Sequence, residues 1–98
     1  MLSTIPINLE TIGREDLDKE ILRVGMIAEL DAVNLYEQMA AMTRNENIKK
    51  LLLDIAKEEK THVGEFQTLL LRLDEEQVVV QHRAQARATT TRRRTTAR

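Results

Sequence analysis

The residues in this chain best suited to chemistry are two glutamates and a histidine. Glu59 and His62 form a Glu-x-x-His motif, which places a carboxylate and an imidazole one turn apart on the same face of a helix. Glu29 lies in an earlier stretch that also has helical character. Oxygen and nitrogen donors without a thiolate suit iron, manganese or zinc. The three residues are therefore candidate metal ligands.

Each candidate ligand interrupts an apolar stripe. Apolar residues recur at intervals of four and three along about residues 15–42 and again along about residues 46–73, which predicts two helices that pack on each other. The first stripe is Leu22, Met26, Glu29, Val33, Tyr36 and Ala40, and the second is Ile48, Leu52, Ile55, Glu59, His62, Phe66, Leu69 and Leu73. A carboxylate in such a stripe is costly unless something balances its charge.

Three arrangements would explain these ionisable residues. The first is a buried Glu–His ion pair within one helix, which needs no metal. The second is a rotation of the helices that exposes the positions to water, which conflicts with the apolar residues at six of the eight positions of the second stripe. The third is a bound metal. A zinc hydrolase is disfavoured, because Glu58 stands where the metalloprotease motif needs a second histidine.

One chain supplies only half of a di-iron carboxylate site. Helical bundles of that class take one Glu from each of two helices and a Glu-x-x-His from each of the other two. Two copies related by a two-fold axis would complete this set, and their four carboxylates would balance two Fe(II). A single hairpin also has no second layer against which to bury its stripes. We therefore expect at least a homodimer, with the metal at the interface.

The composition agrees with one small helical domain. The chain has 98 residues with three Gly, one Pro and no Cys, which excludes a disulfide-stapled scaffold, a thiolate metal site and a many-stranded barrel. No apolar run reaches the length of a membrane span, and the first residues lack a signal-peptide pattern. We expect no membrane partner and a cytoplasmic location.

We divide the chain into an extended leader (residues 1–13), a helical hairpin domain (14–81) and a basic Arg/Thr-rich tail (82–98) that we expect to be disordered. The tail has six arginines and no acid, whereas residues 1–81 have nine Lys and Arg against sixteen Asp and Glu, a net charge of −7. Nucleic-acid binding through the tail is disfavoured, because it has neither aromatic residues nor a recognition motif.

Local signals mark the ends of the helices. Thr43 and Glu46 have the spacing of a capping box between the two antiparallel helices. A short third helix can start after Asp74, which would cap it, although its support fades beyond Val80. Gly25 is the only weak helix former inside the first helix, and its missing side chain would allow a neighbour to approach closely.

Two stretches resemble a known family. The segments AELDAVNLYE (28–37) and AKEEKTH (56–62) are similar to the two helix signatures of the encapsulated ferritins, and the match is closest to archaeal, Pyrococcus-like members. These ferritin-like proteins are housed inside encapsulin nanocompartments. The resemblance covers about residues 14–77. It implies an all-α fold in which a two-helix subunit dimerises into a ferritin-like four-helix bundle, with the dimers arranged in a ring-shaped decamer.

The resemblance also implies a ferroxidase, an enzyme that oxidises Fe(II) to Fe(III) with O₂ at a di-iron site between two subunits. Its place would be inside an encapsulin nanocompartment in the cytoplasm, with the shell protein as partner and iron storage as the purpose. By position, Glu29, Glu59 and His62 are the implied iron ligands, with Glu59 bridging and Glu29 more terminal. Tyr36 matches a tyrosine near the centre, and Asp31 matches an acid associated with metal access. The residues alone leave open whether Tyr36 is simply an interface aromatic.

The chain departs from the family pattern in two places. Ala28 stands where members carry an acid directly before the first ligand, and the C-terminus lacks the Gly- and Leu-containing targeting peptide of encapsulin cargo. Because some archaea fuse the ferritin domain ahead of the shell protein, this chain could be such a domain. The alternative function is non-enzymatic. In that case the chain is a homo-oligomeric helical protein whose Glu–His pairs set the register, and any metal is structural.

Overall fold

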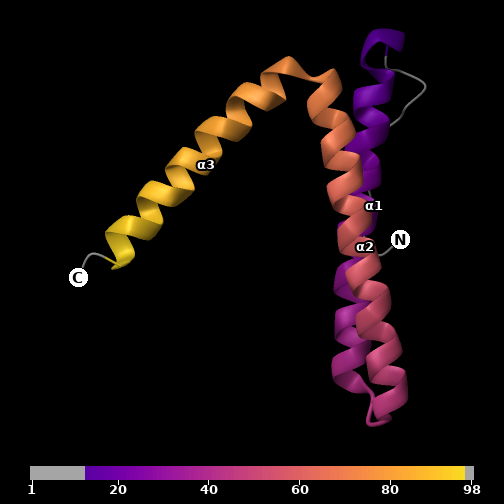
Figure 1. The fold of residues 1–98 in the computed structure, drawn as a ribbon. Helices are drawn as coiled ribbons and strands as arrows, with labels where there is room; N and C mark the ends of the chain where they lie inside the picture. Colours follow the sequence, from indigo (N-terminus) through magenta and orange to yellow (C-terminus); the bar gives the residue numbers. More distant parts are fainter. Residues whose placement is uncertain (1–12, 97–98) are drawn as a thin grey trace.

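Two long antiparallel helices form the body of the molecule, and a third helix diverges from one end of it (Figure 1). The computed structural model describes residues 13–96, in which α1 spans Arg14–Met42, α2 spans Glu46–Leu73 and α3 spans Glu75–Thr96. The described part of the chain contains no strand, so the predicted all-α class is confirmed. Both hairpin helices match their predicted limits to within one residue. Apart from Gly13, the predicted leader lies outside the described residues.

The turn between α1 and α2 is fixed by Asn45. Its Oδ1 accepts hydrogen bonds from the backbone N–H of Asn47 at 2.9 Å and of Ile48 at 3.1 Å, which satisfies two of the donors left free at the start of α2. Thr43 instead follows the end of α1, and its Oγ1 accepts from the N–H of Asn45 at 3.2 Å. The predicted capping box with Thr43 as the cap is therefore wrong, because Asn45 takes that role two residues later.

The junction between α2 and α3 is held by Asp74, as predicted. Its Oδ1 accepts from the backbone N–H of Gln77 at 3.0 Å and so caps α3. Its Oδ2 accepts from Nη2 of Arg23 at 2.6 Å, and this ion pair joins α1 to the first residue after α2. The side chain of Asp74 is only 11% exposed, so its interactions with α1 and α3 are shielded from solvent and hold the junction in place.

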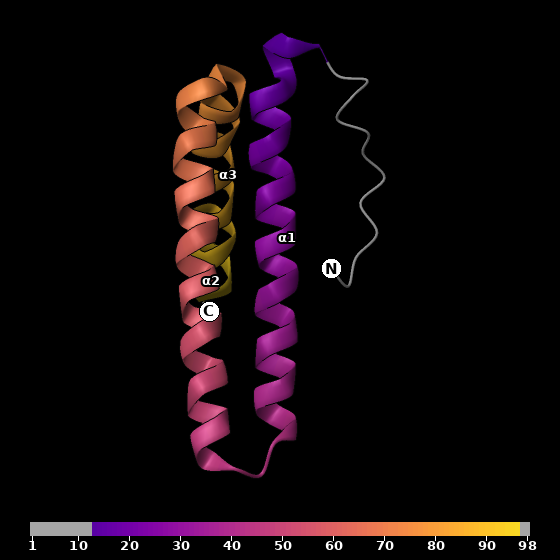
Figure 2. The same cartoon turned by 90° about the vertical axis from the view of Figure 1, so that its right-hand side faces the viewer.

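The third helix is longer than the sequence indicated. It runs to Thr96 rather than fading beyond Val80, so the segment expected to be disordered is helical over its described part. Residues 82–90 are all exposed, and α3, which lies behind α2 in Figure 2, diverges from the hairpin in Figure 1. Gln, Ala and Arg favour helix even without an apolar face, and the Asp74 cap starts it. The missing apolar period therefore did not mean a missing helix.

The core of the hairpin is thin. Among the described residues the buried apolar side chains are Leu22, Val33, Ala40, Ala56 and Leu70. All three on α1 belong to the predicted stripe, but the buried pair on α2 lies one position beyond Ile55 and Leu69. Only part of the predicted α2 stripe therefore packs against α1. Three of its members, Ile48, Leu69 and Leu73, remain 47–49% exposed.

The molecule is extended rather than compact. Its radius of gyration is 17.3 Å, whereas a compact domain of this length has about 13 Å. Figures 1 and 2 show a single layer of two helices with α3 standing away from it. Within residues 13–96, no helix combines the length and the apolar character needed to cross a lipid bilayer. The hairpin therefore leaves apolar surface uncovered.

Candidate metal centre

The three predicted ligands meet near the middle of the hairpin. Glu29 projects from α1, while Glu59 and His62 project from adjacent turns of α2. Nδ1 of His62 lies 3.4 Å from Oε2 of Glu29 and 3.7 Å from Oε2 of Glu59. One donor atom from each of the three residues lies within 4.8 Å of the other two. The fold thus brings together the three side chains that the sequence singled out.

The Glu29 carboxylate lacks the partners that a buried charge needs. Its Oε2 is inaccessible to solvent and has no hydrogen-bond partner. The side chains of Glu29 and Glu59 are only 21% and 20% exposed, so water does little to offset two negative charges at this separation. Leaving such an oxygen unsatisfied costs free energy, which a cation between the two carboxylates would recover. The donor set therefore fits a divalent metal ion such as Fe(II).

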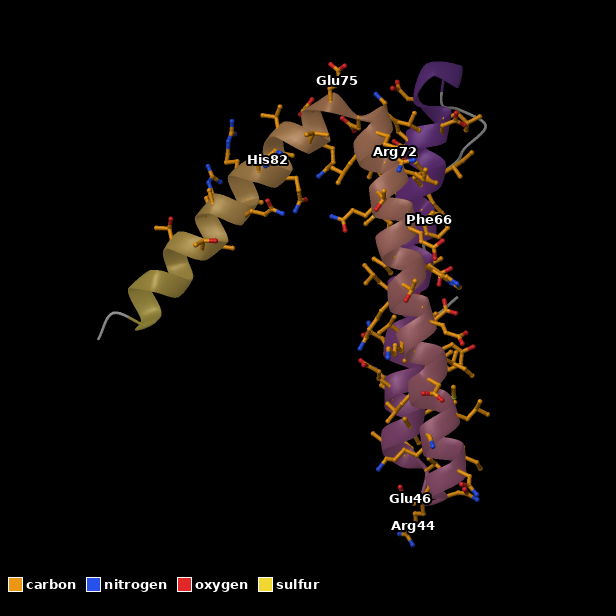
Figure 3. All side chains as sticks on the ribbon, in the orientation of Figure 1. Arg44, Glu46, Phe66, Arg72, Glu75 and His82 are labelled. Atoms are coloured by element: carbon orange, nitrogen blue, oxygen red, sulfur yellow. The ribbon has the colours of Figure 1, made fainter. Side chains whose placement is uncertain are left out.

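A pocket of about 330 Å³ opens beside the cluster, lined by Glu29, His62, Glu65, Phe66 and Leu69. The imidazole of His62 is 48% exposed, so the α2 side of the site faces outward. Phe66 lies where α2 packs on α1 and forms an apolar wall (Figure 3). The sequence analysis placed Phe66 only in the core stripe and did not associate Glu65 with the site. Their positions one turn beyond His62 are the signal that could have shown both as neighbours of the site.

The two weaker candidates do not line this pocket. Tyr36 is half-buried on α1, two turns beyond Glu29. Asp31 is two residues from Glu29, and a separation of two places it on a different face of the same helix. His82, expected to be solvated, is exposed on α3 away from the hairpin (Figure 3).

Partly exposed apolar residues extend along the hairpin from the centre, and Leu69 among them lines its pocket. Ile48, Leu69 and Leu73 follow the same edge of α2 as His62 and are about half exposed, and Ile21 of α1 is 44% exposed. We call these four residues the site face. Three protein donors fill only part of the coordination sphere of a metal such as iron, and the site face leaves room for more from outside the chain.

Three comparisons relate the chain to known proteins. A profile described as Rubrerythrin matches residues 20–97. The crystal structure of the encapsulated ferritin domain from Pyrococcus furiosus is similar with a TM-score of 0.73 and 52% identity, and the match covers 86% of this chain and 88% of that one. The resemblance to the encapsulated ferritins predicted from the two motifs is thereby confirmed.

Two relatives carry names that refer to encapsulins. The chain is 68% identical over 59 residues to the ferritin-like-encapsulin shell fusion protein of Pyrococcus furiosus, a match spanning 60% of this chain and 17% of that protein. It is 39% identical over 69 residues to the encapsulin nanocompartment cargo protein EncC of Myxococcus xanthus, spanning 67% of this chain and 53% of that protein. The match thus covers only part of the length of both relatives.

Proposed function

Because the chain belongs to the Rubrerythrin family, we propose that it is a ferroxidase that oxidises Fe(II) to Fe(III) with O₂ at a di-iron site shared by two copies. The ferritin-like fold supports a role in iron handling. The single observation that carries the proposal is the cluster of Glu29, Glu59 and His62 with its buried, unpartnered carboxylate oxygen. An all-oxygen-and-nitrogen donor set can hold iron in both oxidation states.

The residues of this chain have distinct tasks in the proposed reaction. Glu29 and Glu59 place negative charge beside the metal in a poorly hydrated setting, which favours Fe(III) over Fe(II) and makes the loss of an electron easier. His62 supplies a nitrogen donor that fixes one direction of approach. Bound iron supplies the electrons that O₂ accepts. Phe66 and Leu69 give the pocket an apolar lining, and pairing with a second copy would exclude bulk water from it and reduce the screening of the carboxylates.

A second copy completes the centre in this proposal. The site face is apolar and includes Leu69, which lines the pocket beside the cluster, so pairing two site faces would bury Ile21, Ile48, Leu69 and Leu73 while adding a second set of ligands. The same pairing would turn the two-helix hairpin into a four-helix bundle. Higher assembly of such dimers into a ring-shaped decamer follows from the resemblance to the encapsulated ferritins and has no separate support in the geometry of one chain.

We place the reaction inside an encapsulin nanocompartment in the cytoplasm, with the shell protein as partner. This part of the proposal draws on the names of the two relatives, one a fusion to a shell and the other a cargo protein. A hairpin with so thin a core cannot itself enclose mineral, so storage requires a container.

The test is iron oxidation by metal-free protein. Fe(II) is added without O₂, air is admitted, and ferric absorbance is followed for wild type, His62→Ala and His82→Ala. We expect wild type and His82→Ala to exceed buffer alone and His62→Ala to match buffer, with the same helical circular dichroism in all three. His82 is the matched control because it is the chain's other histidine and lies on α3.

The outcomes separate the proposal from its alternative. If wild type binds iron and dimerises without accelerating oxidation, the metal is structural and the ferroxidase proposal fails. If His62→Ala keeps the full rate, the ligand assignment is wrong. Native mass spectrometry with and without iron then checks the shared site, because a monomer under both conditions would contradict it.

A further inference from the structure

Near the metal centre, α2 approaches α1 closely at Gly25. A Cβ atom placed on this glycine would lie 2.9 Å from both Cε1 and Cζ of Phe66 and 3.1 Å from Cδ1. Carbon atoms in proteins do not approach so closely, since van der Waals contact between them begins near about 3.5 Å. The ring of Phe66 thus rests directly on the backbone of Gly25, and any side chain at that position would displace it.

This contact adjoins the metal centre on both helices. Gly25 lies one turn before Glu29 on α1, and Phe66 lies one turn after His62 on α2. Phe66 also lines the pocket that Glu29 and His62 share. Since α1 closes off one side of the ring, a ring pushed away from Gly25 has to move toward that pocket or force the two helices apart.

We propose that Gly25 is a positioning residue for the metal centre and acts through Phe66. The absent side chain lets one edge of the ring lie close against α1, where the ring forms the apolar wall of the site without filling the space that a cation needs. The glycine weakens α1 by about 1 kcal/mol relative to alanine, a cost that the close contact with Phe66 would offset. This inference rests on the proposed function, because it concerns how tightly the same centre holds its metal.

Gly64 provides a matched control. It lies in the interior of α2, as Gly25 lies in that of α1, yet a Cβ there would meet no atom within 4 Å. Alanine at Gly64 therefore gains helix propensity without a clash, whereas alanine at Gly25 gains the same propensity and meets the ring. Any difference between the two substitutions reports the contact with Phe66.

The experiment titrates the metal-free full chain with Co(II), which binds such donors and does not react with O₂ as Fe(II) does. The readouts are the visible absorption spectrum of bound Co(II), its dissociation constant and the oligomeric state by light scattering. We expect Gly25→Ala to weaken binding by about tenfold to a hundredfold, the range seen when residues supporting metal ligands are changed. Gly64→Ala should bind as wild type does.

The rescue variant distinguishes positioning from general stability. In Gly25→Ala/Phe66→Leu the smaller side chain makes room for the new methyl group, so Co(II) affinity should return toward wild type. Phe66→Leu alone should also weaken binding, because it opens the apolar wall. If Gly25→Ala lowers the melting temperature but leaves the Co(II) spectrum and affinity unchanged, the inference is overturned while the proposed function stands.

Two further outcomes are decisive. If Gly25→Ala does not fold, Phe66→Leu carries the test, and wild-type Co(II) affinity in that variant overturns the inference. If wild type itself binds neither Co(II) nor Fe(II), the proposed function fails and this inference fails with it.

Discussion

One carboxylate oxygen of Glu29, Oε2, is shielded from solvent and accepts no hydrogen bond. The nearest titratable partners are Nδ1 of His62 and the carboxylate of Glu59. A metal would turn the repulsion between the two carboxylates into attraction to a common cation. An ion pair with His62 alone would instead need no metal, and the two explanations predict opposite effects of removing the charge.

The substitution Glu29→Gln distinguishes a bound metal from a Glu29–His62 ion pair. It keeps the shape of the side chain and removes the charge, so the metal-free protein should gain about 1 kcal/mol in its free energy of unfolding because an unsatisfied buried oxygen is relieved. Addition of Co(II) should no longer raise the melting temperature. Urea unfolding and thermal melts measure both effects. Glu58→Gln, an exposed neighbour of Glu59, should change neither.

A fall in the metal-free stability of Glu29→Gln would contradict this view. It would show that the Glu29–His62 pair holds the hairpin together by itself, as the alternative without metal requires.

Sequence spacing predicted that the three candidate ligands lie close together, because a separation of three in one helix and a shared stripe leave few geometries open. It did not predict the cap at the turn, because Thr43 and Asn45 are both good caps two residues apart and only the path of the chain decides between them. It also missed the contact of Phe66 with the centre. The position of Phe66 one turn beyond His62 pointed to it, but its contact with Gly25 depends on the distance between two backbones, which the spacing within one helix does not give.

Helix α2 serves two surfaces at once. One edge of it packs on α1 through Ala56 and Leu70, while the neighbouring edge carries the exposed residues of the site face. The periodicity of the sequence predicted both helices to within a residue but merged these two edges into one stripe. An apolar pattern indicates which residues tend to be shielded from water. It does not distinguish residues that pack within the chain from residues that pack against a second molecule.

The substitution Leu73→Asp tests whether the site face is a dimer interface. Leucine burial is worth about 1.5–3 kcal/mol, so introducing a charge at this half-exposed position should raise the dimer dissociation constant by at least about tenfold. Sedimentation or native mass spectrometry gives the constant. Met42→Asp is the control, because Met42 is 81% exposed at the end of α1 and lies outside the site face. Equal effects of the two substitutions would remove the site face as the interface.

The junction at Asp74 predicts a pH dependence for α3. The backbone hydrogen bond from Gln77 is the main cause that lowers the pKa of Asp74 below 3.8; the Arg23 side chain and the charge of Lys19 lower it further, and burial opposes them. A lowered carboxylate pKa stabilises the fold above pH 3.8, and that contribution is lost as the pH falls through the folded-state pKa. The protection of amides in the first turns of α3, measured relative to the intrinsic exchange rate at each pH, should therefore be high at pH 6 and lower at pH 3.

Asp74→Asn should reduce this protection at pH 6 and abolish most of its pH dependence, because asparagine can still cap α3 but cannot pair with Arg23 as a charge. Arg23→Gln should have a similar effect, and the double variant should be little worse than either single one. Strictly additive losses would mean that the two side chains do not act together.

The molecule as a whole is extended and has a small apolar core. Its extents are 49 × 47 × 21 Å, and its described part buries only small or medium-sized apolar side chains. A chain that buries so little should be marginal by itself, and stability then depends on the concentration of partner copies. The sequence predicted that one chain buries too little apolar surface, because a single hairpin has half of a ligand set and no second layer of helices to pack on. The direction and length of α3 could be seen only in the structure.

Stability should consequently rise with protein concentration. For a folded dimer in equilibrium with unfolded chains, each tenfold increase in concentration adds about 1.4 kcal/mol to the apparent free energy of unfolding. Urea titrations across a range of protein concentrations measure the shift. An unchanged midpoint would show that the hairpin is stable as a monomer and that the site face needs no partner.

The short turn capped by Asn45 also has a consequence for the order in which α1 and α2 pair during folding. Glu29 and Glu59 are separated from this turn by roughly equal lengths of helix, about 20 Å on each side. Contacts near a short connection form fastest, because little loop entropy opposes them. Pairing of α1 with α2 would then proceed from the turn outward, and the ligands would meet only after several turns of each helix had joined. Iron would therefore encounter a binding site only in chains that have already completed much of their folding.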